Sequence, residues 1–144
     1  MEEKSFKHKI KISVRFSDLD ALRHVNNAAY LSYLEEARIA YFTDVLDTPK
    51  NSLNIGAIIA RIEIDYIRPI VLGDEVEILT RVSKIGNKST DVEHLILIKH
   101  EDNSVHAAAA VTKLVSYDYK KLQSVVISDE IKDKIRAYEV LSVN

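Results

Sequence analysis

The order of two hydrophobic periodicities constrains the fold of this 144-residue chain more than any other feature. Residues 27–46 have helical spacing, because their apolar and aromatic side chains recur at intervals of three or four. Strand-like alternation occurs in five other segments, one before this helix and four after it: 6–16, 57–67, 75–85, 89–100 and 104–117. An apolar helix stripe must cover a sheet face, so this order predicts an α+β fold with a five-stranded antiparallel sheet wrapped on one long helix.

Several local signals refine this prediction. In the first strand, alternation places one set of apolar residues on the same face: Phe6, Ile10, Ile12, Val14 and Phe16. The run 95–98 is apolar without alternation, which indicates burial on both faces of the sheet. The run Ala107–Ala110 favours helix by propensity, but its flanks and the neighbouring turns predict a strand. Ser128 is the expected N-cap of a short helix over 129–140.

Loops and turns are expected between these elements. Residues 17–26 are predicted to be a loop, with Asn26 or Asn27 as the N-cap of the long helix. That helix is expected to end at 47–49, and a further loop is expected at 51–54. Gly86–Asn87 predicts a hairpin turn, and residues 101–103 predict another turn.

Composition excludes several classes of protein. The chain has 47% hydrophobic residues, so it can build a core as a single domain over residues 1–144. A net charge of −2 argues against nucleic-acid binding, and the absence of cysteine excludes disulfides and thiolate nucleophiles. No apolar run approaches the length of a membrane span, and the charged N-terminus leads into no signal-peptide core. These features predict a cytoplasmic protein.

The candidate chemistry lies in the loop before the long helix. This loop contains Asp18, Asp20, His24, Asn26 and Asn27. A helix N-terminus offers free backbone N–H groups that can stabilise an oxyanion, and a nearby carboxylate can activate water or attack a carbonyl. The alternative is that the aspartates and Asn26 are turn and cap residues, because Asp and Asn are common in such loops.

Two motifs resemble the hotdog-fold acyl thioesterases. The first is Asp18-Leu19-Asp20, followed by His24-Val25-Asn26-Asn27, Tyr30 and Glu35-Glu36-Ala37-Arg38; the second is Tyr66, Arg68-Pro69 and Gly73-Asp74. The resemblance is to the 4-hydroxybenzoyl-CoA thioesterase or YbgC type, with features of the acyl-ACP thioesterases. It implies a single hotdog domain that hydrolyses an acyl thioester.

The resemblance assigns catalytic roles residue by residue. Asp20 matches the family's catalytic carboxylate, which acts as general base or nucleophile. The Asn27 N–H matches the oxyanion donor, and His24 matches the histidine of the acyl-ACP type. This chain departs from that type at Leu22, where the family has Asn, and from the YbgC type at Asn27, where the family has His.

Other residues are expected to contact the substrate. Asp18, Asn26 and Tyr30 are candidates near the thioester, although Asp18 could instead hold the loop and Tyr30 could belong to the core. Glu35 and Arg38 are expected to form an ion pair on the helix surface. Coenzyme A phosphates would meet basic residues of the third strand and the following turn, namely Arg81, Lys84 and Lys88.

The remaining expectations concern ligands, assembly and competing functions. No cofactor or metal is expected; coenzyme A or an acyl carrier protein would enter as part of the substrate. The resemblance implies a homo-oligomer, a dimer or tetramer, with sheets paired edge to edge and the active site between subunits. Two alternatives stay open: a hotdog acyl-thioester hydratase or dehydratase, and a non-catalytic acyl-binding protein.

Overall fold

The computed structural model describes residues 1–48 and 56–140. The expected loop at 51–54 and the Pro49 helix stop therefore lie outside the described residues. The elements follow in chain order: η1 (Glu3–Ser5), β1 (His8–Ser13), η2 (Phe16–Asp18), α1 (Asn27–Val45), β2 (Ala57–Tyr66), β3 (Glu75–Ile85), β4 (Ser89–Lys99), β5 (Ser104–Asp118), β6 (Gln123–Ser124) and α2 (Asp129–Glu139).

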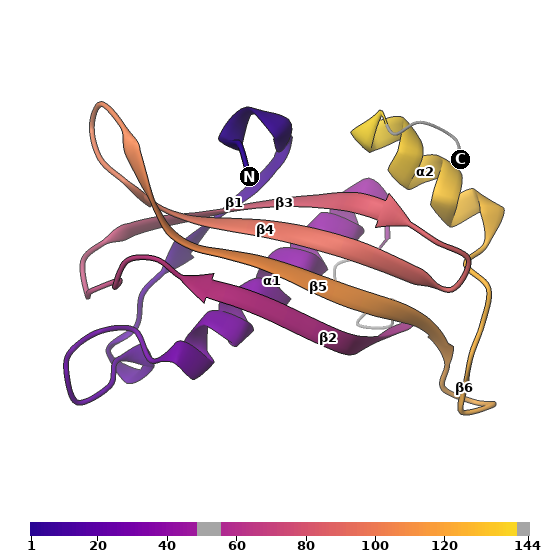
Figure 1. Ribbon diagram of the computed structural model, residues 1–144, viewed down its shortest axis with the longest axis horizontal. Helices are drawn as coiled ribbons and strands as arrows, with labels where there is room; N and C mark the ends of the chain where they lie inside the picture. Colours follow the sequence, from indigo (N-terminus) through magenta and orange to yellow (C-terminus); the bar gives the residue numbers. More distant parts are fainter. Residues whose placement is uncertain (49–55, 141–144) are drawn as a thin grey trace.

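One antiparallel sheet and one long helix make up the body of the molecule. The strand order is β1-β3-β4-β5-β2, so β1 and β2 form the two edges, and the two-residue β6 pairs with the end of β5. Helix α1 lies across one face of the curved sheet (Figure 1). The predicted α+β hotdog architecture is confirmed; β6 is too short to give an alternation signal and was not expected.

The face of the sheet toward α1 carries the main core. Tyr30, Tyr33, Leu34 and Ala37 of α1 pack here on buried residues of β1, β3, β4 and β5. The Ala107–Ala110 run is part of β5. Ala107, Ala108 and Ala110 line the sheet beneath the helix, and Ala109 packs on the opposite face. The strand prediction for this run is confirmed, because pairing with two neighbouring strands overrides the helical propensity of alanine.

A polar layer separates this core from a second apolar cluster. Arg38, Thr80, His94 and Thr112 are all buried. Along each element, the layer is flanked on one side by members of the first cluster and on the other by members of the second. The second cluster includes Tyr41 and Phe42 of α1 and Ile135 of α2, so α2 covers the C-terminal end of α1.

The opposite face of the sheet is covered by the N-terminal segment. Phe6 packs there on Leu79, Leu95 and Leu97, which explains why β4 is buried on both faces, as predicted. The expectation that Phe6 and Phe16 share a face with Ile12 is wrong. The strand extends only from His8 to Ser13, so the alternation does not carry over to the 3-10 turns on either side, and Phe16 is 81% exposed.

Candidate active site

The loop between β1 and α1 folds back on itself as a short, tight ladder. Leu19 forms a β-bridge with Val25, the Asp20 N–H donates to the His24 carbonyl at 2.8 Å, and the Asn26 N–H donates to the Asp18 carbonyl at 2.8 Å. The turn closes with Arg23 at φ 63°. This ladder holds Asp20 and His24 side by side, close to the start of α1.

The second sequence motif packs directly against this loop. His24 forms a β-bridge with Val71, and the Val25 N–H donates to the Ile70 carbonyl at 2.8 Å. Residues 71–74 form a tight turn in which the Asp74 N–H donates to the Val71 carbonyl at 3.2 Å. Gly73 occupies φ 93°, a conformation that strains other residues and suits the third position of a type II turn. The two motifs therefore form one structural unit.

The two aspartates are held differently. Asp18 Oδ2 accepts hydrogen bonds from the Arg15 N–H at 2.9 Å and from the Tyr33 hydroxyl at 2.7 Å, so it ties η2 to the buried face of α1. Asp20 Oδ1 accepts from the N–H groups of Leu22, at 2.9 Å, and His24, at 3.2 Å. Within the described ranges no hydrogen bond reaches Asp20 Oδ2, which leaves one carboxylate oxygen oriented and available.

Burial and hydrogen bonding also change the pKa values of the tyrosines near this loop. Burial raises the pKa of Tyr33, and its hydrogen bond to the Asp18 carboxylate adds to the effect. Burial likewise raises the pKa of Tyr30, against the opposing effect of a hydrogen bond with the Ile70 backbone. Both hydroxyls stay protonated at neutral pH, so Tyr33 acts as a donor to Asp18.

The start of α1 provides a free donor beside the ladder. Asn26 is the N-cap, as predicted, and its side chain accepts from the Ala28 N–H at 2.9 Å. No hydrogen-bond acceptor in the described part of the chain takes the Asn27 N–H. The Asn27 carbonyl accepts from the Tyr66 hydroxyl at 3.0 Å, which links this helix end to the end of β2. The free N–H and the helix dipole both favour negative charge at this position.

An open hollow of about 840 Å³ lies over the loop. Its lining combines the polar Asp20, Arg23 and His24 with apolar side chains from both motifs: Phe16, Leu19, Leu22, Val71 and Leu72. Asp18 does not line it. Neither Arg23 nor the apolar members were expected. Two signals pointed to the apolar members: the pair Val71-Leu72 before Gly73, and the apolar Leu19 and Leu22 within a polar loop.

The structure does not bring the other expected substrate contacts to this hollow. Lys84 lies near the far end of β3, and Lys88 lies in the turn that follows it. At about 3.3 Å per strand residue, this end of β3 is roughly 30 Å from the turn at 71–74. Arg81 is engaged elsewhere, since its Nε donates to Glu93 Oε2 at 2.5 Å and its guanidinium lies over the Phe6 ring. Tyr30 is 3% exposed, with its ring packed edge-on against Tyr66. Contact of these residues with substrate stays a prediction.

The expectation that Glu35 and Arg38 form an ion pair on the helix surface is wrong. Arg38 lies on the same helix face as Leu34 and is 4% exposed, with its guanidinium 3.4 Å from the Thr112 hydroxyl. No Glu35–Arg38 contact within ion-pair distance occurs among the described residues. Burial lowers the pKa of Arg38, and the charge of Glu35 acts against this shift.

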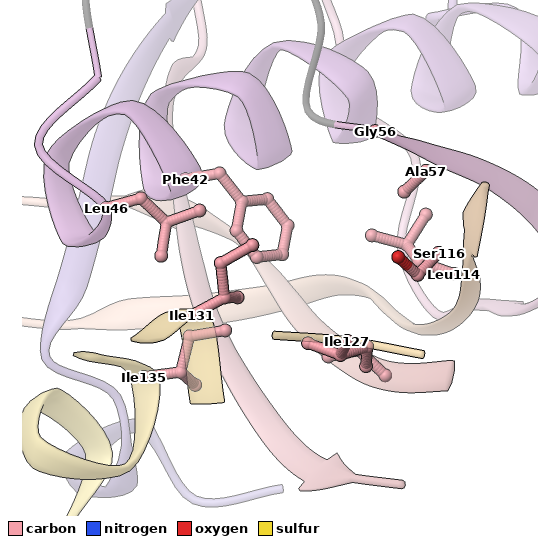
Figure 2. Close-up of a pocket in the computed structure, with 10 residues that line it drawn as sticks. Phe42, Leu46, Gly56, Ala57, Leu114, Ser116, Ile127, Ile131 and Ile135 are labelled. Atoms are coloured by element: carbon pink, nitrogen blue, oxygen red, sulfur yellow. The ribbon is translucent and has the colours of Figure 1, made fainter. Parts of the chain in front are cut away.

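A second, smaller hollow lies at the opposite end of the molecule. Figure 2 shows Phe42 and Leu46 of α1 facing Ile131 and Ile135 of α2, with Ala57, Leu114 and Ser116 on the other side. The loop with Asp20 meets the N-terminal end of α1 and α2 covers its C-terminal end (Figure 1). This hollow holds about 40 Å³, and only Thr90 and Ser116 among its described lining residues carry polar side chains.

Neither a metal cluster nor a membrane-spanning helix is found in the described ranges. No three His, Cys, Asp or Glu side chains within 1–48 and 56–140 are placed to hold a metal ion together. No helix among these residues is long and apolar enough to cross a membrane.

Comparison with known proteins defines the class. A family model described as the thioesterase-like superfamily matches residues 14–135, so the chain belongs to this superfamily. The resemblance noted in the sequence is confirmed, and so is the class of enzyme it implied, a thioester hydrolase.

Individual relatives agree with this class. The chain is 32% identical over 130 residues to the long-chain acyl-CoA thioesterase FadM of Escherichia coli, covering 87% of this chain and 94% of FadM. A thioesterase from Thermus thermophilus, solved with coenzyme A and Zn, is 37% identical with a TM-score of 0.86, covering 97% of this chain and 99% of the other. A 4-hydroxybenzoyl CoA thioesterase, with a TM-score of 0.77, covers 89% of this chain and 97% of its own; at 15% identity it shows a shared fold alone.

Proposed function

We propose that this protein hydrolyses acyl thioesters of coenzyme A at the hollow above the β1–α1 loop, with Asp20 as the catalytic carboxylate. The observation that carries the proposal is the joint placement of Asp20 and His24 in the lining of an open hollow. Asn27, the first residue of α1, follows His24 by three positions, and its N–H has no acceptor among the described residues, which supports its proposed role as oxyanion donor. Membership of the thioesterase-like superfamily supports the reaction type, and the names of FadM and the Thermus thermophilus structure support coenzyme A as the thiol.

The proposed reaction needs one base and one oxyanion site. The free oxygen of Asp20 accepts a proton from water as the water oxygen attacks the thioester carbonyl carbon. The carbonyl oxygen becomes an oxyanion, which the Asn27 N–H and the helix dipole stabilise. The C–S bond then breaks, coenzyme A leaves as thiolate and takes up a proton, and the free acid remains. In the nucleophilic variant, Asp20 attacks the carbonyl carbon itself, the C–S bond breaks and coenzyme A leaves as thiolate, and water then hydrolyses the resulting anhydride to the free acid and the Asp20 carboxylate.

Neighbouring residues have supporting roles in this proposal. Asp18 positions the loop, because its carboxylate is bonded to Arg15 and Tyr33 and lies outside the hollow lining. Asn26 fixes the helix start as N-cap, because its side chain accepts from the Ala28 N–H. His24 lines the same hollow as Asp20 and assists proton transfer.

The proposal includes a homodimer formed at the β2 edge. Among the described residues, strand β2 pairs with β5 alone, so its other side offers unpaired backbone groups to a second strand. Exposed apolar side chains gather on it and just after it: Ile58, Ile59, Tyr66 and Ile67. The opposite edge, β1, carries exposed lysines at positions 9 and 11, which disfavour strand addition there. A second copy paired along β2 would lie beside the Tyr66–Asn27 contact.

A panel of coenzyme A thioesters tests the proposed function. Acetyl-, hexanoyl-, decanoyl- and benzoyl-CoA are incubated with the full chain, and thiol release is followed with a colorimetric reagent. We expect hydrolysis of at least one of them well above the rate without enzyme. Hydration of an enoyl-CoA without thiol release would instead support the hydratase alternative, and binding without either reaction would support an acyl-binding protein.

A further inference from the structure

The hydroxyl of Tyr66, the last residue of β2, reaches the first residue of α1. It donates to the Asn27 carbonyl oxygen at 3.0 Å, where the end of β2 meets the start of the helix (Figure 1). Helix geometry directs the Leu31 N–H to the same oxygen, so Tyr66 occupies its second lone pair. Tyr66 is not among the described residues that line the hollow over Asp20. Its hydroxyl therefore acts on the helix start and not on a molecule in the hollow.

Two side chains hold the peptide group between Asn27 and Ala28. Its oxygen accepts from Tyr66 at 3.0 Å, and its N–H donates to the Asn26 side chain at 2.9 Å. Both polar atoms of this peptide are therefore fixed. The Asn27 N–H belongs to the preceding peptide, and only the φ and ψ angles of Asn27 separate the two. Holding the Asn27–Ala28 peptide in place thus restricts the direction in which the Asn27 N–H points.

The backbone and the ring of Tyr66 are themselves held in place. In the sheet, Tyr66 pairs with Ala108, and the N–H groups of the next two residues both donate to the Ala107 carbonyl, at 2.8 and 3.0 Å. The Tyr66 ring packs edge-on against the ring of Tyr30, with the ring centroids 5.0 Å apart. Tyr30 lies in the first turns of α1 and is 3% exposed. The sheet and the helix together therefore aim the Tyr66 hydroxyl at the Asn27 carbonyl.

We propose that Tyr66 is a positioning residue for the oxyanion site, because its hydroxyl fixes the first peptide of α1 and thereby the direction of the Asn27 N–H. This inference rests on the proposed function and deepens it by naming a group that acts through the oxyanion donor. A donor stabilises the developing oxyanion best when it is already aimed before the reaction begins. A small misplacement of a catalytic group costs rate even where the substrate still binds. The Tyr66 hydroxyl is therefore expected to contribute to kcat and not to substrate affinity.

The test compares Tyr66→Phe with a matched control at the other end of the same strand. Tyr66→Phe removes the hydroxyl and keeps the ring that packs on Tyr30. In the control, Tyr119→Phe removes a hydroxyl that donates to the Ala57 carbonyl at 2.8 Å, at the start of β2. The two tyrosines are similarly exposed, Tyr66 at 48% and Tyr119 at 52%.

Four properties of each variant are measured. The values of kcat and KM are determined as a function of pH on an acyl-CoA that wild type hydrolyses. Urea unfolding gives the stability, and light scattering gives the molar mass. The residual dipolar coupling of the Asn27 N–H bond, recorded by NMR in an aligned medium, reports the direction of that bond without any turnover.

We expect Tyr66→Phe to lower kcat about fivefold to fiftyfold, with KM within about twofold of wild type and the shape of the pH profile unchanged. The coupling of the Asn27 N–H should change in Tyr66→Phe, while Tyr119→Phe should keep the wild-type kcat and coupling. Wild-type kcat in Tyr66→Phe, or an equal fall in both variants, would overturn the proposal. A fall in kcat that comes with a lower urea midpoint or a lower molar mass and an unchanged coupling would assign the bond to stability or assembly instead.

The NMR measurement separates this proposal from the proposed function. If wild type hydrolyses no thioester but Tyr66→Phe alone changes the coupling, the proposed function fails and the control of the helix start by Tyr66 stands. If the coupling is the same in wild type and Tyr66→Phe, the positioning role fails whatever the turnover of the protein.

Discussion

The buried His94 of the polar layer is expected to make the stability of the fold depend on pH. His94 is fully buried, with Nδ1 3.1 Å from the Thr80 hydroxyl. Burial, together with the nearby positive charge of Arg38, lowers the pKa of His94 to about 3. A histidine in the unfolded chain has a pKa of about 6.5, so below that pH the unfolded state binds a proton that the folded state excludes.

The sign and magnitude follow from this difference in proton uptake. Stability falls as the pH drops through about 6.5 and continues to fall until about pH 3. At about 1.4 kcal/mol per pH unit, His94 alone lowers the free energy of unfolding by about 2 kcal/mol between pH 6.5 and pH 5. That is a large share of the ~5–15 kcal/mol typical of a folded domain.

Urea unfolding at several pH values measures this contribution. The His94→Gln variant has no titrating ring at this position. Between about pH 7 and pH 5, we expect its free energy of unfolding to fall by about 2 kcal/mol less than that of wild type, whatever its absolute stability. His100→Gln is the control, because His100 is exposed on the β4–β5 turn and should keep the wild-type pH dependence. Equal pH dependence in wild type and His94→Gln, or an NMR titration of the His94 ring near pH 6.5, would show that the folded protein does not exclude this proton.

Three further predictions concern the loop and the assembly. His24→Ala should lower turnover without changing the urea midpoint, whereas an unchanged rate from about pH 6 to about pH 9 would leave His24 without a catalytic part. Asp18→Asn should destabilise the fold by about 1–3 kcal/mol through its bonds to Arg15 and Tyr33, measured by urea unfolding; full stability with abolished turnover would contradict a positioning role. Light scattering at micromolar concentration should give at least twice the mass of one chain, and a monomer would exclude pairing at the β2 edge.

Hydrophobic periodicity predicted most of this fold because each element buries one continuous stripe. Helix α1, predicted over 27–46, spans Asn27–Val45, and β3 has the predicted bounds. Periodicity failed where a residue leaves its element. Phe16 continues the alternation of β1, yet it lies in a 3-10 turn, where the alternation no longer decides the direction of a side chain.

Among the polar residues that line the hollow, Asp20 and His24 were predicted from the sequence and Arg23 was not; its apolar residues were not predicted. Asp20, His24 and Asn27 stand within eight consecutive residues, so a single loop had to place them near one another. Val71 and Leu72 are distant in sequence, and only the bridge from His24 to Val71 shows that they share a hollow with Asp20. Arg38 could not be assigned from its spacing to Glu35, because the same helical spacing also places it with Leu34 toward the sheet.

The turnover of the Asp20→Asn variant on an acyl-CoA that wild type hydrolyses tests whether Asp20 is the catalytic carboxylate. The substitution keeps the side-chain oxygen that accepts from Leu22 and His24 while removing the charge and basicity of the carboxylate. We predict that kcat falls at least about 10²-fold, with a near-normal urea midpoint and substrate affinity. A folded Asp20→Asn variant that keeps most of its turnover, while Asp18→Asn loses it, would contradict the assignment of Asp20 as the catalytic carboxylate.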